Sequence, residues 1–251
     1  LTLSGADSMH EVKIGCVGLG FPNFKARSLK IFERSGDALK NITDQWNVQI
    51  VAYSDLLETM EDAKKASRYF EKSGIDLLLV QASSFSLGHV IYPLLEKQTR
   101  IGFWFVPEPS YEGELALNSL TGFNLVMSIC KKFAENVQYK WFFGWPGEQS
   151  FDRPFIVTLR ALRAVTGLPR SKVAQIGGIV PSFDNLDYSP TELEKNLGIE
   201  VIPIAIEELF DRCRQVKPLR VKELTEQLCN RASSILVDSF ALEKTARTMG
   251  A

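Results

Sequence analysis

Apolar runs alternate, over the first 150 residues, with stretches in which apolar positions recur every three or four residues. The runs are rich in branched and aromatic side chains, as strands buried on both faces usually are. They cover residues 12–17, 48–53, 75–80, 101–106 and 141–143. The stretches between them predict helices, for example through Met60, Ala63, Ala66 and Phe70. This alternation predicts an α/β fold with a doubly wound, Rossmann-like parallel sheet in residues 10–149.

Two helix starts lie close to the polar ends of these strands. One helix is predicted to run from Pro22 or Asn23 through Leu39. Another follows Asn118 and Ser119, either of which can cap it by accepting from a free backbone N–H.

After Gly147 the pattern starts again, with a helix from Asp152 to Val165. Residues 150–251 then show only two strand patterns, at 172–180 and 199–204, followed almost entirely by helical spacing. Two strands are fewer than the four to six of a usual sheet. We therefore interpret residues 150–251 as a second, incomplete α/β unit, and residues 1–9 as a disordered lead-in.

Charge and composition exclude several classes of protein. The chain has 251 residues with a formal net charge of -1, so no electrostatic footprint for nucleic acid or an anionic membrane is present. No apolar run approaches the roughly 20 residues that a membrane-spanning helix needs. Cys16, Cys130, Cys213 and Cys229 form no CxxC pair, which favours a reducing cytoplasm over a disulfide scaffold or a zinc site.

The glycines after the first strand raise the possibility of a nicotinamide cofactor. Gly18 and Gly20 fit a G-x-G-x-x-G fingerprint, but its third glycine position is Asn23. Asp55 follows the second strand, where an acid that binds ribose would lie. A tight loop after a buried strand explains the same residues.

Polar groups also follow the third and fourth strands. Gln81, Ser83 and Ser84 can hydrogen-bond a polyhydroxylated ligand, or the serines can cap a helix. Glu108, Glu112 and Glu114 crowd one loop, which suits either acid/base work or a solvated surface. The sequence contains no G-x-S-x-G, G-x-x-x-x-G-K or H-E-x-x-H motif.

Three segments resemble the N-terminal region of the L-fucose and L-arabinose isomerase superfamily. They are residues 75–86 (IDLLLVQASSFS), 117–122 (LNSLTG) and 140–145 (KWFFGW). The Leu-Asn-x-x-x-Gly element that opens a helix, with Lys-x-x-x-Gly about twenty residues later, is the most specific of these motifs. Arabinose isomerases have Gln and His where Ser119 and Gly122 align, so the sugar stays open.

The resemblance implies a metal-dependent aldose–ketose isomerase that acts in carbohydrate metabolism as a cytoplasmic homo-oligomer. Residues beyond this chain would bind its divalent metal, usually manganese, and would provide its acid/base groups. No catalytic or metal-binding residue is therefore assigned within this chain, which alone is expected to be inactive. Loops of the first domain would contact a small-molecule sugar. The residues predicted to do so are Gly18, Gly20, Phe21, Ser83, Ser84, Asn118, Ser119, Gly122 and Trp145.

Two alternatives remain open from the sequence. A two-lobed sugar-binding or sensor module would need both lobes within this chain and a hinge near residue 147. A nicotinamide-dependent oxidoreductase would use the loop that follows Gly18.

Overall fold

The computed structural model describes residues 11–98, 100–110, 112–134 and 137–251. The chain divides into two compact units between Thr166 and Gly167. Residues 11–166 are called the first unit below, and residues 167–251 the second unit. The predicted lead-in, residues 1–9, lies outside the described residues.

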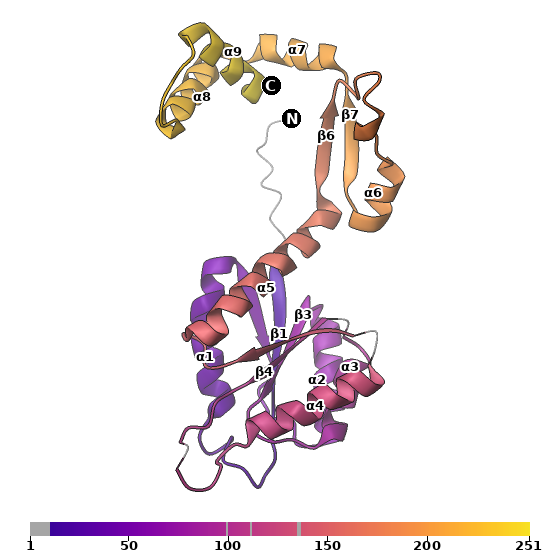
Figure 1. The fold of residues 1–251 in the computed structure, drawn as a ribbon, viewed down its shortest axis with the longest axis vertical. Coiled ribbons are helices and arrows are strands. Elements are labelled where there is room, and N and C mark those ends of the chain that lie inside the picture. The colour runs from indigo at the N-terminus through magenta and orange to yellow at the C-terminus, as the bar shows by residue number, and fades with distance from the viewer. Residues whose placement is uncertain (1–10, 99, 111, 135–136) are drawn as a thin grey trace. The chain divides into compact units, whose positions relative to one another are not determined.

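Five parallel strands form the sheet of the first unit (Figure 1). In spatial order they are β2 (Val48–Ala52), β1 (Val12–Leu19), β3 (Leu77–Ala82), β4 (Arg100–Phe105) and β5 (Gln138–Phe143). Every neighbouring pair is parallel. The doubly wound sheet predicted from the sequence is therefore confirmed, and each predicted run overlaps one strand.

Helices cover both faces of this sheet (Figure 1), which explains why its central strands are almost wholly apolar. One core cluster joins the sheet to α1 (Ile31–Thr43) and α5 (Gln149–Gly167). The other joins it to α2 (Met60–Ser73), α3 (Tyr92–Leu95) and α4 (Ser119–Phe133). Two short 3-10 helices complete the unit, η1 (Asp44–Trp46) and η2 (Gly88–Ile91).

Helix α5 belongs to the core of the first unit, although the sequence pattern grouped it with the second. Its buried face carries Phe151, Phe155 and Leu159. The ring centroids of Phe142 on β5 and Phe155 lie 5.6 Å apart with the rings edge to face. Phe142 of β5 thus packs against the helix that follows it, whereas Tyr139, Trp141 and Phe143 contact rings of β4 and α4.

The first helix begins later than predicted. Residues 22–30 form turns, and α1 starts only at Ile31, after Lys30 in a left-handed conformation with φ of 51°. The backbone N–H of Lys25 donates to the carbonyl of Ala116 at 2.9 Å. A tertiary hydrogen bond of this kind holds the segment out of a helix, and local propensity does not reveal it.

Helix α2 shows how local sequence sets a boundary. The hydroxyl of Thr59 accepts from the N–H of Asp62 at 3.2 Å, and the Asp62 carboxylate accepts from the N–H of Thr59 at 3.2 Å. This is a capping box. The Thr59 hydroxyl also donates to the Asp62 carboxylate, which lowers the pKa of that carboxyl. Gly74, with φ of 61°, ends the helix.

The second unit contains a two-stranded parallel sheet, β6 (Lys172–Ile176) and β7 (Glu200–Ile204). Its helices are η3 (Leu168–Arg170), η4 (Asp184–Leu186), α6 (Pro190–Leu197), α7 (Ile206–Gln215), α8 (Pro218–Arg231) and α9 (Ser239–Gly250). β6 ends four residues before the predicted strand does, because Gly177 and Gly178 both have positive φ.

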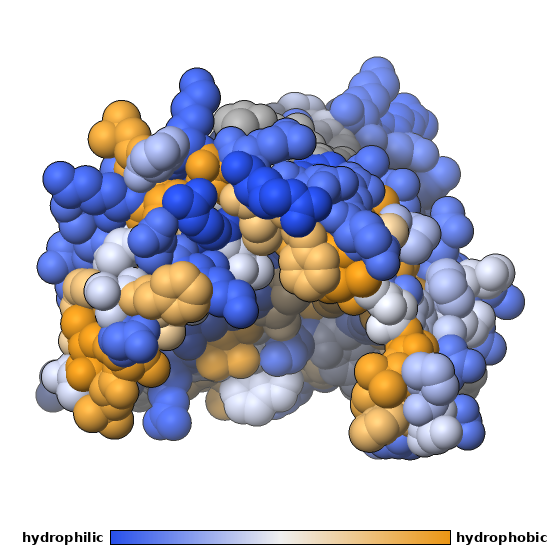
Figure 2. All heavy atoms as spheres, turned by 90° about the horizontal axis from the view of Figure 1, so that it is seen from above, coloured by the Kyte–Doolittle hydropathy of each residue, from blue (hydrophilic) through white to orange (hydrophobic). Residues whose placement is uncertain are grey.

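Large apolar side chains of the second unit reach the surface. The exposed fractions are 93% for Leu236, 75% for Phe240 and 70% for Leu219. Figure 2 shows hydrophobic residues among hydrophilic ones on the surface of the chain. In the described part of the chain, no helix combines the length and apolar character needed to cross a lipid bilayer.

Thiol reactivity should separate the four cysteines into two pairs. Burial raises the pKa of Cys16 to about 12 and that of Cys130 to about 11, whereas Cys213 and Cys229 are partly exposed. The thiolate is the nucleophile, so a thiol reagent at pH 8 is expected to modify the second pair and to reach the first only after denaturation. Mass spectrometry of the labelled peptides measures this, and rapid labelling of Cys16 in the native protein would contradict it.

Candidate functional site

The strand order β2-β1-β3 creates a topological switch point. In open parallel sheets of this order, ligands bind outside the carboxyl ends of the strands, where the chain leaves to opposite faces. Here β1 leads to α1 on one face, and β3 leads through η2 and α3 to the other. The loops after β1 and β3 therefore form the centre of the candidate site.

Hydrogen bonds tie four loops together at this edge. The N–H of Gly20 donates to the carbonyl of Leu57 at 3.0 Å, which joins the β1 and β2 loops. The N–H of Phe21 donates to the Ser84 hydroxyl at 3.2 Å, which joins the β1 and β3 loops. The N–H of Phe85 donates to the carbonyl of Leu117 at 2.7 Å, which joins the β3 and β4 loops. The edge is thus a preorganised rim.

Three phenylalanines stand together on this rim. The rings of Phe21 and Phe85 meet edge to face with their centroids 5.9 Å apart, and Phe24 lies 6.0 Å from Phe85. All three are half-buried. Aromatic faces of this kind offer apolar contact to the C–H surfaces of a sugar ring.

A cavity of about 170 Å³ opens beside these rings. It is lined by Phe21, Pro22, Phe24, Ala26, Arg27, Leu56 and Glu58. Arg27 and Glu58 form an ion pair across it, with the guanidinium 3.1 Å from the carboxylate. The Arg27 side chain is 61% exposed. Since Arg carries five N–H donors, the pair leaves donors free for a polar or anionic ligand group.

The predicted glycines lie where the rim packs most closely. A Cβ at Gly18 would come within 2.6 Å of Leu56 and 2.8 Å of the Ser83 hydroxyl. One at Gly122 would lie 2.9 Å from the Cα of Phe85. Gly20 follows β1 directly. Gly122 lets α4 approach the β3 loop, and Gly18 and Gly20 let β1 approach Leu56, so their evident role is packing beneath the rim.

The predicted serines are fully buried. The Ser83 hydroxyl donates to the Gln81 side-chain oxygen at 2.6 Å, and the Ser84 hydroxyl donates to the Phe85 carbonyl at 3.1 Å. The Ser119 hydroxyl donates to the carbonyl of Val106. Each hydroxyl therefore holds the rim together in this structure. Their contact with a sugar stays a prediction.

Asn118 and Trp145 remain half-buried at the same edge. Asn118 has φ of 51° and precedes α4 as predicted, but neither it nor Ser119 caps the helix through its side chain. The Asn118 side-chain oxygen instead accepts from the Thr121 hydroxyl at 2.6 Å. The N–H of Trp145 donates to the Glu148 carboxylate at 2.9 Å. The amide of Asn118 and the ring of Trp145 are thus the predicted groups most open to a ligand.

Glu108 organises the β4 loop. Its carboxylate accepts from three consecutive backbone N–H groups, those of Ala116 and Leu117 at 3.0 Å each and that of Asn118 at 2.5 Å. A carboxylate used in this way fixes the approach to α4. The sequence left two roles open for the acidic residues of this loop, acid/base chemistry and a solvated surface. Neither role describes Glu108.

Metal chemistry has no donor set in the described residues. In that part of the chain, no group of three or more His, Cys, Asp and Glu side chains is placed to hold an ion. The described residues therefore do not themselves form a site for a divalent metal, no chemical step is assigned to one, and binding of a metal by residues beyond this chain stays a prediction.

Three residues of the rim were not predicted to bind a ligand: Phe24, Arg27 and Glu58. Arg27 and Glu58 are distant in sequence, and only the adjacency of β1 and β2 in the sheet brings their loops together. The serine-rich turn did include Phe85, but its pairing with Phe21 depends on the same sheet order. The signals that the sequence offered for this pair were a cation, Arg27, in the loop after β1 and an acid, Glu58, in the loop after β2.

The chain resembles sulfoquinovose isomerases. Those of Priestia aryabhattai and Priestia megaterium are each 26% identical to it over 166 residues, which is 65% of this chain and 36% of theirs. That of Alkalicoccus urumqiensis is 25% identical over 142 residues, 56% of this chain and 32% of its own. The chain therefore spans about a third of the length of these relatives. No protein-family model matches it.

The dinucleotide alternative lacks its usual geometry in this structure. A pyrophosphate binds where a glycine-rich turn opens directly into a helix N-terminus. Here turns fill residues 22–30, and α1 begins only at Ile31. The backbone N–H groups of Gly20 and Phe21 instead donate hydrogen bonds to the β2 and β3 loops.

Proposed function

We propose that this chain is part of an aldose–ketose isomerase of carbohydrate metabolism, related to the L-fucose and L-arabinose isomerases, and that its first unit binds the sugar. The similarity to sulfoquinovose isomerases over 65% of the chain carries this proposal. The rim supports it, because a preorganised edge with aromatic faces and amide groups suits a polyhydroxylated ligand.

In this proposal the described residues bind and orient the substrate. The rings of Phe21, Phe24 and Phe85 cover one face of the sugar, and the side-chain amide of Asn118 forms hydrogen bonds with the hydroxyl groups of the sugar. Sulfoquinovose carries a sulfonate, which suits the free donors of Arg27. Residues outside this chain would provide the groups that transfer hydrogen between the first two carbons and the ligands of the divalent metal.

A binding experiment with matched sugars tests the proposal. Isothermal titration of the 251-residue chain is expected to detect sulfoquinovose, and to show weaker binding of glucose, because glucose lacks the sulfonate. Arg27→Ala is expected to weaken sulfoquinovose binding by about tenfold or more, since a hydrogen bond to a charged group contributes about 1.5–3 kcal/mol. The same variant should leave glucose binding unchanged.

Arg34→Ala serves as the control, because Arg34 is exposed on α1, which starts after the rim loop. It should bind both sugars as the wild type does. Absence of binding to either sugar, or equal loss in the two variants, would refute the assignment of this rim. Turnover of sulfoquinovose by this chain with manganese would refute the placement of the chemistry elsewhere.

A further inference from the structure

The outer edge of the sheet is unusually rich in exposed aromatic side chains. β5 is the last strand in the spatial order, and no described strand lies beyond it. The exposed fractions are 59% for Trp141, 39% for Tyr139 and 38% for Phe143. Soluble proteins normally protect such edges, because unpaired backbone groups and apolar side chains promote association.

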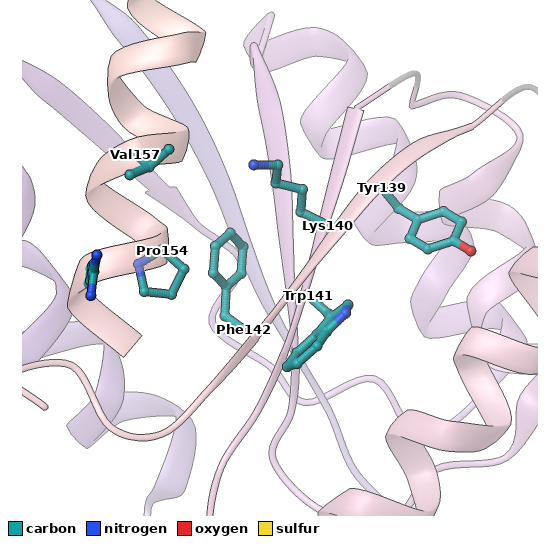
Figure 3. A pocket seen from close by; sticks show the side chains of 7 residues that line it. Tyr139, Lys140, Trp141, Phe142, Pro154 and Val157 are labelled. Atoms are coloured by element: carbon teal, nitrogen blue, oxygen red, sulfur yellow. The ribbon is translucent and has the colours of Figure 1, made fainter. Parts of the chain in front are cut away.

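Two hollows follow this edge. One of about 590 Å³ is lined by Tyr139, Lys140, Trp141, Phe142, Arg153, Pro154 and Val157, and a second of about 270 Å³ shares Tyr139, Lys140 and Phe142. Figure 3 shows Lys140 and Phe142 on the side of α5, with Trp141 and Tyr139 directed away from it. The lining thus comes from both faces of one strand, so the hollow wraps the sheet edge and suits a polypeptide.

The charge of this surface has one sign. Arg100, Lys140 and Arg153 line the hollows and are exposed, and no carboxylate lines either hollow. None of the three cations has an ion-pair partner within the described part of the chain. We call Arg100, Tyr139, Lys140, Trp141, Arg153 and Val157 the β5 groove.

This charge argues against two β5 strands pairing with each other. A two-fold contact would place the cations of one groove near those of the other, and like charges facing each other are destabilising. An acidic occupant with apolar neighbours fits better, because it would neutralise the cations and cover the aromatic rings.

The first unit itself exposes such a segment. Glu112 and Glu114 lie on the β4 loop, both exposed, and Leu115 beside them is 53% exposed. Neither glutamate has an ion-pair partner among the described residues. Their spacing presents two carboxylates and one apolar side chain within four residues.

We propose that residues 112–115 of one copy of this chain dock in the β5 groove of a second copy. The two carboxylates pair with Lys140 and Arg153, and Leu115 covers Trp141. The two surfaces differ, so the contact is head to tail, and copies joined by it form a closed ring or an open chain.

A charge exchange tests this proposal in the 251-residue chain by sedimentation velocity over a concentration series. The wild type is expected to associate. Lys140→Glu/Arg153→Glu and Glu112→Lys/Glu114→Lys should each shift association to at least about tenfold higher concentration, because close interfacial charge pairs couple strongly. An equimolar mixture of the two variants should associate again, since each supplies the surface that complements the other.

Arg34→Glu/Arg68→Glu is the matched control, because it makes the same charge change at exposed positions of α1 and α2. It should associate as the wild type does, and every variant should keep the wild-type circular dichroism. A wild type that stays monomeric would overturn the proposal. Association that persists in Glu112→Lys/Glu114→Lys would also overturn it. So would an equimolar mixture of the groove variant and the loop variant that fails to associate.

Discussion

Replacing Trp104 with alanine is expected to lower the free energy of unfolding of the first unit by about 3–5 kcal/mol. The side chain is fully buried near the carboxyl end of β4, and its ring centroid lies 4.8 Å from that of Phe151 on α5. Its indole N–H donates to the carbonyl of Gly144 at 2.9 Å. The substitution removes both the packing and that hydrogen bond. Domains are stable by only about 5–15 kcal/mol, so this loss is a large fraction.

Trp141→Ala provides the matched comparison. It makes the same chemical change on the neighbouring strand, but Trp141 is 59% exposed, so the expected loss is about 1 kcal/mol or less. Hydrogen exchange of β3 and β4 amides reports the opening of the first unit separately from the second. If the two variants were equally destabilised, the role of the buried Trp104 side chain in the core would be contradicted. Trp104→Phe, which loses the hydrogen bond while keeping a ring, should fall between them.

Replacing Glu108 with alanine is expected to release the β4 loop from its approach to α4. Three backbone N–H groups lose their acceptor, and hydrogen bonds to a charged group contribute about 1.5–3 kcal/mol each. Amide exchange at Ala116, Leu117 and Asn118 should therefore accelerate by at least about tenfold. Sugar binding at the rim should weaken as well, because Asn118 is no longer held in place.

Two further variants separate this role of Glu108 from its charge alone. Glu108→Gln keeps one acceptor oxygen but places an amide where the second oxygen accepted, so its effect should be intermediate. Glu114→Ala removes a carboxylate from the same loop without breaking these hydrogen bonds and should leave the exchange rates unchanged. Equal acceleration in the alanine variants of Glu108 and Glu114 would mean that general electrostatics, and not the three hydrogen bonds, order the loop.

Local pattern was sufficient for the elements of the sheet. All five parallel strands of the first unit were predicted. A strand covered on both faces favours an apolar run such as Leu77–Val80 of β3, and the exposed edge strand β5 was found from its aromatic residues. The end of α2 also follows a strong local signal, because Gly74 readily adopts the left-handed conformation that ends the helix. The late start of α1 was not, because the hydrogen bond from Lys25 to Ala116 joins segments far apart in the sequence.

The candidate site could likewise be predicted only in part from the sequence. The predicted residues all lie at or beneath the carboxyl edge of the sheet, since strand ends and the residues after them can be found from pattern alone. Which of them face outward was not predictable. Ser83 and Ser84 are buried under the rim, while Arg27 and Glu58 meet across a cavity that the sequence did not reveal.

The sequence by itself determined that this protein has a parallel α/β sheet with polar loops after its strands, because burial on two faces imposes a pattern on neighbouring residues. The tertiary structure alone decided the spatial order of the strands, the ties between loops and the exposed cationic edge of β5. These features depend on which distant segments become neighbours, and no periodicity within one segment records that.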